Sequence, residues 1–302
     1  MGIGSKVSIQ EIKIEEQYDH LVKKHPCFNG EAHFKYGRIH LPVSPTCNIQ
    51  CKFCKRSLNK NENRPGVAGK ILSPAEAVEL VGKALELCPE ITVVGIAGPG
   101  DTLATPNALD TFELVDKRYP HLIKCLSTNG LMLKHYAKRI ADVGIKTISV
   151  TVNAVDPEIL QDICSGIFWE KNYLEGKDGA AVLIDAQLEG IREVSRPGVT
   201  VKVNTVLIPG LNYVHIEEIA RVVKKAGASV MNIIPLIPQH EFISFRAPNC
   251  NELDSARVTA EKYLQVFRHC RQCRADACGI PGKGVDLAGL LYDQPLENFS
   301  HG

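Results

Sequence analysis

Residues 38–54 read RIHLPVSPTCNIQCKFC, an apolar segment followed directly by three cysteines at the spacing C-x3-C-x2-C. Three thiolates on one short loop, Cys47, Cys51 and Cys54, can hold three corners of an iron–sulfur cube and leave the fourth iron without a protein ligand. An open iron can bind and reduce another molecule, whereas a closed four-thiolate site only transfers electrons. The alternatives are a structural zinc site and buried unpaired thiols. Zinc sites usually recruit two C-x-x-C pairs, so we favour the iron–sulfur site.

Around this loop, apolar β-branched runs alternate with amphipathic helical stretches. The continuous Val, Ile and Leu character of the runs predicts parallel strands buried on both faces. The expected strands are residues 38–43, 91–97, 122–127, 147–152, 199–207 and 229–237. The expected helices are residues 74–87, 106–118, 133–143, 180–195 and 216–226. Six β/α units in succession predict an α/β fold built on a parallel TIM-like barrel, partial or closed, with an open doubly wound sheet as the alternative.

The alternation divides the chain into three parts. We expect an N-terminal extension over residues 1–37, the barrel over 38–240, and a C-terminal extension over 241–302. Both extensions contain cysteines, including Cys27 in the first and the C-x-x-C pair Cys270 and Cys273 in the second. Paired cysteines in a reducing compartment usually bind metal or perform redox chemistry, so this pair is a second candidate metal site.

Composition excludes several classes of function. The 302 residues carry a formal net charge of +1, which provides no basic footprint for nucleic acid. No stretch is apolar enough to span a membrane, and the first 17 residues lack the apolar core of a signal peptide. The odd total of 11 cysteines argues against a complete disulfide framework. We therefore expect a cytoplasmic protein whose cysteines bind metal.

Polar turns follow the predicted strands at the end where barrel enzymes place their active sites. They are the cysteine loop and residues 98–101, 127–130, 153–156 and 209–212. A single Gly, Pro or Asn turn is usually only a turn. Five turns at the same end of successive strands form a pattern, because one cofactor could contact them all.

Ten sequence blocks together resemble the NifB family of radical S-adenosylmethionine (SAM) enzymes, which act in biosynthesis of the nitrogenase iron–molybdenum cofactor. The blocks are residues 25–28, 38–43, 47–54, 62–67, 98–101, 125–131, 151–158, 204–210, 235–239 and 270–277. They extend over nearly the whole chain, and the fold they imply is the radical SAM type of barrel. The carrier-like domain that many bacterial members add at the C-terminus is absent, so the chain resembles the short archaeal form.

The resemblance implies an unusual reaction. The family binds two further [4Fe–4S] clusters, K1 and K2, and fuses them into an eight-iron precursor with a central carbide. One SAM donates its methyl group to a cluster sulfide, and a second is cleaved to a 5′-deoxyadenosyl radical that removes a hydrogen from that methyl. The implied partners are iron–sulfur cluster donors, a low-potential electron donor and downstream maturation scaffold or carrier proteins, with no nucleic acid or membrane.

The resemblance also assigns metal ligands. Cys47, Cys51 and Cys54 would hold the SAM cluster, whose open iron SAM chelates. The second set would be Cys27, Cys270 and Cys273. For K1 the family uses a histidine and two cysteines, of which His40 and Cys125 are present. Without the resemblance, His40 would be read as a structural histidine and Cys125 as a buried small hydrophobe.

One ligand of K1 is missing. The family's other cysteine lies in the loop that corresponds to residues 55–63, which contains no cysteine. K1 would then have two protein ligands, recruit Glu62, or borrow a cysteine from elsewhere. Cys88, Cys164, Cys250 and Cys278 have no assigned role, and Cys164 or Cys278 could be a spare ligand.

The remaining candidates surround SAM. The second-strand turn of the family contacts the methionyl amine, and glycine there would allow close backbone approach. The candidate SAM or K1 contacts are Gly98, Pro99, Gly100, Asp101, Thr128, Asn129 and Asn153. Glu62 and Arg64 could position the substrate cluster or transfer protons, and the equally weighted alternative is an exposed loop salt bridge.

Two other functions stay open at this point. One is a different radical SAM enzyme with auxiliary clusters, such as one that modifies a peptide, although no peptide-binding module is evident. The other is a non-catalytic iron–sulfur scaffold or electron carrier, for which the chain is large and its barrel turns have no purpose.

Overall fold

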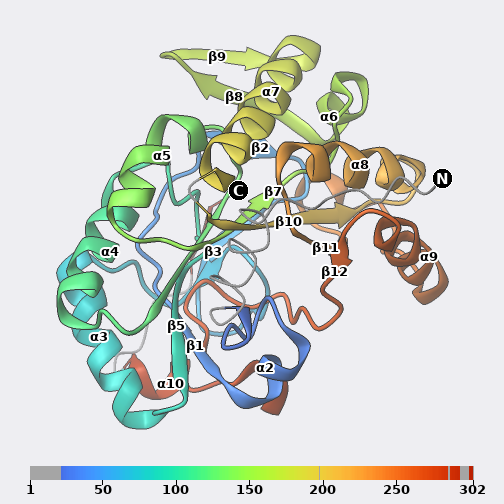
Figure 1. Ribbon diagram of the computed structural model, residues 1–302. Helices are drawn as coiled ribbons and strands as arrows, with labels where there is room; N and C mark the ends of the chain where they lie inside the picture. The colour runs from blue at the N-terminus through green and yellow to red at the C-terminus, as the bar shows by residue number, and fades with distance from the viewer. Residues whose placement is uncertain (1–21, 197, 285, 293–298, 302) are drawn as a thin grey trace, which may run out of the picture.

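The computed structural model describes residues 22–196, 198–284, 286–292 and 299–301, and its centre is one curved sheet of eight strands (Figure 1). Seven of the strands are parallel and lie side by side in chain order, and β13 pairs with β1 antiparallel. The strands are β1 (Gly37–His40), β5 (Ile91–Ile96), β6 (Ile123–Thr128), β7 (Thr147–Thr151), β10 (Thr200–Leu207), β11 (Val230–Pro235), β12 (Gln265–Val266) and β13 (Cys278–Gly279). A doubly wound sheet reverses its strand order, and this sheet does not, so the barrel prediction is confirmed.

Helices surround the outer face of the sheet in Figure 1. They are α3 (Pro74–Leu87), α4 (Asn107–Arg118), α5 (Leu133–Asp142), α7 (Gly176–Ser195), α8 (Ile216–Ala226) and α9 (Cys250–Glu261). Helix α3 begins where Ser73 and Glu76 form a reciprocal capping box. All six predicted strands and all five predicted helices are present, with bounds that differ by a few residues. Among the described residues, edge strands β12 and β13 do not pair with each other, so the barrel is partial.

Several shorter elements were not predicted. They are α2 (Gly30–Lys35), β2 (Ile49–Cys51), β3 (Arg56–Leu58), β4 (Val67–Ala68), α6 (Pro157–Ile163), β8 (Cys164–Trp169), β9 (Asn172–Glu175), α10 (Ala288–Leu291), β14 (Phe299–His301) and the 3-10 turns Tyr213–His215, His240–Phe242 and Pro281–Lys283. They form two small sheets, β14-β3-β4 and β2-β8-β9. The second matters for the site, because it places Cys51 opposite Cys164.

The barrel strands have two different faces. Residues such as Leu126, Val150 and Val203 are fully buried between the sheet and the outer helices. The alternate residues on the same strands, including Cys125, Ser149 and Lys202, line an internal cavity. TIM barrels normally fill this interior with bulky apolar side chains. A hollow interior with polar side chains among its lining residues leaves room for a ligand.

The C-terminal extension contributes to the barrel sheet. Its strand β12 adds to β11 and its strand β13 adds to β1, so the connecting residues 267–277 lie between the two edges of the sheet. The division of the chain into an N-terminal extension, a barrel and a C-terminal extension, with boundaries at residues 37 and 240, stays a prediction. Within the described residues, no helix combines the length and apolar composition needed to cross a bilayer.

Candidate active site

The cysteine loop follows β1 and is fastened to the 98–101 turn by its backbone. The Gly100 N–H donates to the Ser44 carbonyl at 2.7 Å, and the Asp101 N–H donates to the Thr46 carbonyl at 2.8 Å. A Cβ on Gly100 would lie 2.0 Å from the Thr46 oxygen. The glycine expected to make room for SAM therefore makes room for the cysteine loop. These two backbone hydrogen bonds hold the loop that carries the three thiols against the turn that follows β5.

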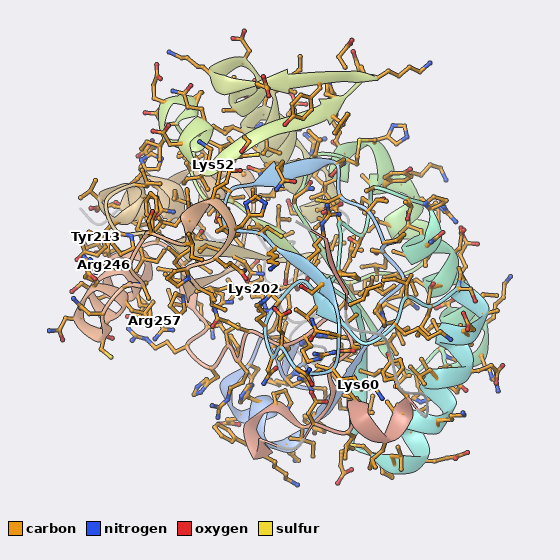
Figure 2. All side chains as sticks on the ribbon, turned by 180° about the vertical axis from the view of Figure 1, so that it is seen from behind. Lys52, Lys60, Lys202, Tyr213, Arg246 and Arg257 are labelled. Carbon is orange, nitrogen blue, oxygen red and sulfur yellow. The ribbon has the colours of Figure 1, made fainter. Side chains whose placement is uncertain are left out.

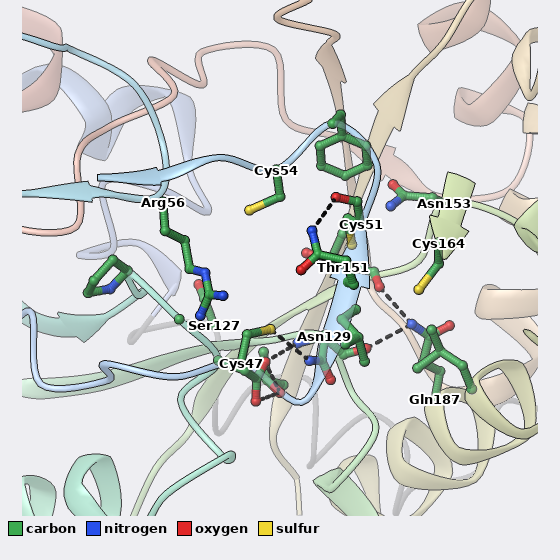
Figure 3. Close-up of a pocket in the computed structure, with 18 of the residues that line it drawn as sticks. Cys47, Cys51, Cys54, Arg56, Ser127, Asn129, Thr151, Asn153, Cys164 and Gln187 are labelled. Carbon is green, nitrogen blue, oxygen red and sulfur yellow. Dashed lines mark hydrogen bonds between the residues drawn. The ribbon is translucent and has the colours of Figure 1, made fainter. Parts of the chain in front are cut away.

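Cys47, Cys51 and Cys54 line a first cavity, of about 190 Å³, with their side chains around a common space (Figure 3). Most of the candidates for SAM contacts line the same cavity. They are Pro99, Gly100, Asp101, Thr128, Asn129 and Asn153. Gly98 is not part of the lining, and it precedes a cis peptide bond to Pro99 with φ of +130°. We call this space the SAM cavity.

Asp101 organises the floor of the SAM cavity. Its carboxylate accepts hydrogen bonds from the Asn129 N–H at 2.5 Å, the Leu103 N–H at 2.9 Å and the Thr128 hydroxyl at 3.0 Å. Burial raises the pKa of Asp101 although these donors oppose the shift. The Asn129 amide in turn donates to Asn48 Oδ1 at 2.7 Å, which connects Asp101 to the cysteine loop. The expected polar contacts thus form one bonded network.

The thiols of the SAM cavity fit an iron–sulfur cluster. Burial raises the pKa of Cys47 to about 12 and raises the pKa of Cys54 in the same direction. These thiols become thiolates only if bound positive charge compensates burial, as iron would. Within the part of the chain that the structure describes, no three His, Cys, Asp or Glu side chains converge on a single ion, as a structural zinc would require.

The same cavity offers an unused hydrogen-bond acceptor. The Gln187 amide nitrogen donates to the carbonyls of Asn129 and Thr151, at 2.7 and 2.9 Å (Figure 3). Among the residues that the structure describes, none donates to its buried Oε1. A buried amide oxygen without a donor costs free energy unless a ligand supplies one. The amine or ribose hydroxyls of SAM would do so, and the residues present therefore fit this cofactor.

A second cavity, of about 320 Å³, occupies the barrel interior. The five remaining ligand candidates line it, namely Cys27, Cys270, Cys273, His40 and Cys125. They come from the N-terminal extension, strands β1 and β6, and the segment between β12 and β13. We call this space the barrel cavity. The structure thus brings together residues up to 246 positions apart in sequence, from Cys27 to Cys273.

The surroundings of one histidine and one cysteine in the barrel cavity favour metal binding. The carbonyl of Arg274 lies 3.1 Å from His40 Nδ1, so Nδ1 must be the protonated donor and Nε2 is left as a ligand. Burial lowers the pKa of His40 to about 4, which keeps the imidazole neutral. Burial raises the pKa of Cys27 to about 12, and the charge of Lys202 opposes this shift.

Comparison with known proteins agrees with this geometry. Residues 41–223 match the family model of the radical SAM superfamily. The chain is 49% identical to the FeMo cofactor biosynthesis protein NifB of Methanocaldococcus infernus over 87% of this chain and 88% of that protein. It is 48% identical to NifB of Methanocaldococcus jannaschii, over 94% of this chain and 98% of that protein.

The chain belongs to the NifB family. It is a radical SAM protein, and the superfamily uses a [4Fe–4S] cluster with SAM. NifB of Azotobacter vinelandii is 40% identical over 87% of this chain, but only 54% of that protein is covered.

Solved structures confirm the fold. A radical SAM methyltransferase from Sphaerobacter thermophilus matches 79% of this chain and 69% of its own, with a TM-score of 0.56 and 16% identity. Streptococcus suis SuiB bound to S-adenosylmethionine matches 90% of this chain and 58% of its own, with a TM-score of 0.56 and 12% identity. The radical SAM type of barrel is therefore shown.

Glu62 and Arg64 line neither cavity. Arg64 donates to the Glu62 carboxylate and to Ser57 Oγ at 3.0 Å, and it also reaches the Lys55 carbonyl. Both side chains brace the loop after the NifB-family cysteine triplet, which favours the salt-bridge alternative. Because Glu62 does not line the barrel cavity, its recruitment by K1 stays a prediction.

Four basic residues of the barrel cavity and its border were not predicted, one of which is Arg271 in the cavity lining. Arg38 donates to Cys273 Sγ at 3.1 Å, and Lys202 lines the cavity wall. Arg274 donates to the carbonyls of Asn59 and Glu62 and pairs with Asp276, so it ties the 267–277 segment to the loop after the triplet. A signal was available for Lys202, because Lys202, Asn204 and Val206 alternate with fully buried apolar residues on one strand.

The unassigned cysteines have different positions. Cys164 lines the SAM cavity and pairs with Cys51 in the β2–β8 ladder, and its thiol donates to the Gly166 carbonyl at 3.5 Å (Figure 3). Cys88 and Cys278 are buried and line neither cavity, and Cys250 is exposed at the start of α9. Cys164 is the only one of the four at either cavity among the described residues.

Proposed function

We propose that this protein acts in biosynthesis of the nitrogenase iron–molybdenum cofactor, where it converts two [4Fe–4S] substrate clusters into an eight-iron carbide-containing precursor. The observation that carries the proposal is that the SAM cavity and the barrel cavity share one wall. The shared lining residues are Phe53, Cys54, Ala97, Pro99, Ser127 and Thr151. A reactive carbon bound in one cavity would therefore lie next to metal held in the other.

The SAM cavity would prepare the carbon donor. The bound cluster and SAM supply methyl transfer and reductive cleavage of SAM. Cys47, Cys51 and Cys54 hold three irons, and Asp101 orients Asn129 and Thr128 along the cavity floor. Gln187 Oε1 accepts a hydrogen bond from the cofactor. The apolar side chains of Leu160 and Leu183 exclude water from the far wall.

The barrel cavity would hold the substrate clusters. Cys27, Cys270 and Cys273 bind one cluster, and His40 and Cys125 bind the other. Two protein ligands hold the second cluster more loosely than three would. That suits a cluster that must move toward its neighbour before the two are fused. The protein would receive clusters from iron–sulfur donors and electrons from a low-potential donor, and would pass its product to maturation scaffolds or carriers.

Anaerobic reconstitution tests the proposal. Protein supplied with iron, sulfide, reductant and SAM should bind about twelve irons per chain, as three cubes require, and should release 5′-deoxyadenosine. Its product should activate nitrogenase that lacks the cofactor. Absence of 5′-deoxyadenosine would contradict radical chemistry. Formation of 5′-deoxyadenosine without activation would instead support a different radical SAM enzyme with auxiliary clusters.

A further inference from the structure

Lys202 is a buried cation without an anionic partner. It lies on β10 and is only 5% exposed, and Figure 2 shows it in the middle of the molecule in that view. Its Nζ donates one hydrogen bond, at 2.8 Å, to the backbone carbonyl of Cys27. Within the described ranges, no carboxylate forms an ion pair with it. A buried ammonium with one neutral acceptor is costly, because burial removes its hydration and nothing compensates the charge.

Lys124 provides the contrast within the same sheet. It lies on β6 and is also 5% exposed, but its ammonium pairs with the Asp116 carboxylate. Asp116 is half exposed and belongs to α4, on the outside of the barrel. The fold therefore compensates one buried lysine with its own carboxylate and leaves the other uncompensated. The difference is that Lys202 lines a cavity.

The surroundings of Lys202 fix the ammonium in place. Its Nζ lies 4.5 Å from the ring centroid of Phe28 and 5.5 Å from that of Phe267, both of which are buried. Aromatic faces attract a cation but do not neutralise it. The neighbouring strands present Ser149 and Asn232 to the same cavity, and neither carries charge. The positive charge is thus held rigidly and remains available to a ligand.

Lys202 lies between the two ligand sets of the barrel cavity. Its hydrogen bond reaches Cys27, which belongs to one set. Its charge also acts on the thiol of Cys125, which belongs to the other set and lies on β6, two strands away in the sheet. Two other cations lie on the side of the first set: Arg271, which lines the cavity next to Cys270, and Arg38, which bonds to Cys273 Sγ at 3.1 Å.

We propose that Lys202 is the fixed counter-charge for the anionic iron–sulfur substrate of the barrel cavity. Thiolate-ligated clusters carry negative charge from their cysteines, and bringing two of them together adds repulsion that a cation between them offsets. Lys202 is thus a positioning residue that permits both clusters to occupy one cavity. This inference rests on the proposed function.

The test uses Lys202→Met, which keeps the length and apolar stem of the side chain and removes its charge. Lys202→Arg restores the charge, and Lys124→Met is the matched control for loss of a buried lysine. Thermal unfolding of the full chain without clusters is compared with iron content and cluster spectra after anaerobic reconstitution. The electron paramagnetic resonance signal that shifts on SAM addition marks the SAM cluster separately from the others.

Lys202→Met is expected to raise the unfolding temperature of the cluster-free chain and to lower its iron content after reconstitution. The cluster-free Lys202→Met chain unfolds at a higher temperature than wild type, because an uncompensated buried charge is gone. After reconstitution it retains at most half of the barrel-cavity iron, while the SAM-shifted signal persists. Lys202→Arg restores the iron. Lys124→Met unfolds at a lower temperature and keeps its iron, because it breaks an ion pair outside the cavity.

Two results would overturn the inference. One is wild-type iron content and spectra in Lys202→Met. The other is a lower unfolding temperature of cluster-free Lys202→Met with iron loss that arginine does not rescue, which would make Lys202 a structural support for Phe28 and Phe267. If wild type itself holds iron only in the SAM cavity, the proposed function fails, and that result is distinct from both.

Discussion

The SAM cavity and the barrel cavity are neighbours that the chain builds in opposite ways. The SAM cavity takes all three thiols from one loop of eight residues, Cys47 to Cys54. The barrel cavity takes its ligands from four distant segments, and Cys27, Cys270 and Cys273 all lie outside the stretch that matches the radical SAM superfamily. The local site lies in the stretch that matches the superfamily model, and the distributed site is the one we propose for the substrate clusters.

The difference also concerns charge. The SAM cavity is lined by one cation, Arg56, and by a carboxylate, Asp101, that accepts several hydrogen bonds from the cavity walls. The barrel cavity is lined by two cations, Lys202 and Arg271, and Arg38 at its border bonds to Cys273 and to the Gly279 carbonyl. A cavity lined by cations and thiols is suited to anionic metal clusters, and a cavity with an organised carboxylate is suited to a cofactor with an amine.

The largest expected effect comes from removal of one cysteine of the triplet, which should affect the SAM cavity and leave the barrel cavity unchanged. Cys51→Ala should reduce 5′-deoxyadenosine formation to background and remove about four irons, because a cube with two thiolates on that loop is not retained. Iron in the barrel cavity should remain. Product chromatography and iron analysis measure both. Cys250→Ala, which removes an exposed thiol, should match wild type, and residual SAM cleavage above that of a triple-cysteine variant would contradict the assignment.

The reciprocal variant is Cys273→Ala. It should lose about four irons from the barrel cavity, because one of three ligands is gone and Arg38 loses its sulfur partner. SAM cleavage should continue without activation of cofactor-free nitrogenase. Mössbauer spectroscopy and nitrogenase activation measure the two properties. Unchanged iron and full activation would remove Cys273 from the site.

A smaller effect is expected within the SAM cavity. Asp101→Asn keeps the shape of the side chain but replaces a charged acceptor of three hydrogen bonds. Loss of charge-assisted bonds costs about 1.5–3 kcal/mol, so SAM affinity should fall about 10- to 150-fold through misplacement of Asn129. Equilibrium dialysis on the reconstituted protein measures this. Asp110→Asn, which alters an outer-surface ion pair with Arg139, should leave affinity unchanged.

The smallest expected effect is a pH dependence of the free energy of unfolding, caused by buried histidines near the barrel cavity. Burial lowers the pKa of His25, His33 and His40, to about 4 in the last case. Between pH 6.5 and about 4 the unfolded chain binds protons that the folded chain does not, so the free energy of unfolding is highest above this range and falls as pH decreases.

His40→Gln tests this dependence in the cluster-free chain. Its free energy of unfolding should fall less steeply with decreasing pH than that of wild type, by roughly 1 kcal/mol per pH unit. Urea unfolding across the range measures the slope. The exposed His135→Gln is the control. Equal slopes for His40→Gln and wild type would mean that His40 protonates as readily in the folded chain.

Much of the fold could be predicted because buried parallel strands have a strong local signature. The runs at 147–152 and 199–207 are apolar and β-branched, and each became a strand with nearly those bounds. The β8–β9 hairpin has no such signature. Its Phe168 and Tyr173 are exposed and contact each other at 4.9 Å between ring centroids, so neither the period nor the burial resembles that of a core strand.

The residues of the candidate site show the same difference between a local sequence signal and a position that only the fold determines. A triplet of cysteines on one loop is visible in eight residues, because proximity in sequence guarantees proximity in space. Lys202 and Arg38 are single basic residues on strands, and only the barrel topology turns their side chains toward Cys27 and Cys273. The resemblance to a family supplied the distant cysteines, but it did not supply the charges around them.

The two edge strands of the partial barrel have a mechanical consequence. Strands β12 and β13 each pair with their neighbour over only two residues. Between them runs the 267–277 segment, which carries Cys270 and Cys273. Among the described residues, no ladder of hydrogen bonds closes the barrel on this side. That segment is fastened by single backbone bonds and by side chains: Arg274 donates to the carbonyls of Asn59 and Glu62, Gln272 to that of Pro235, and Arg38 to Cys273 Sγ. Separation of these two edges would leave the seven parallel strands paired, because among the described residues no ladder hydrogen bond joins β12 to β13.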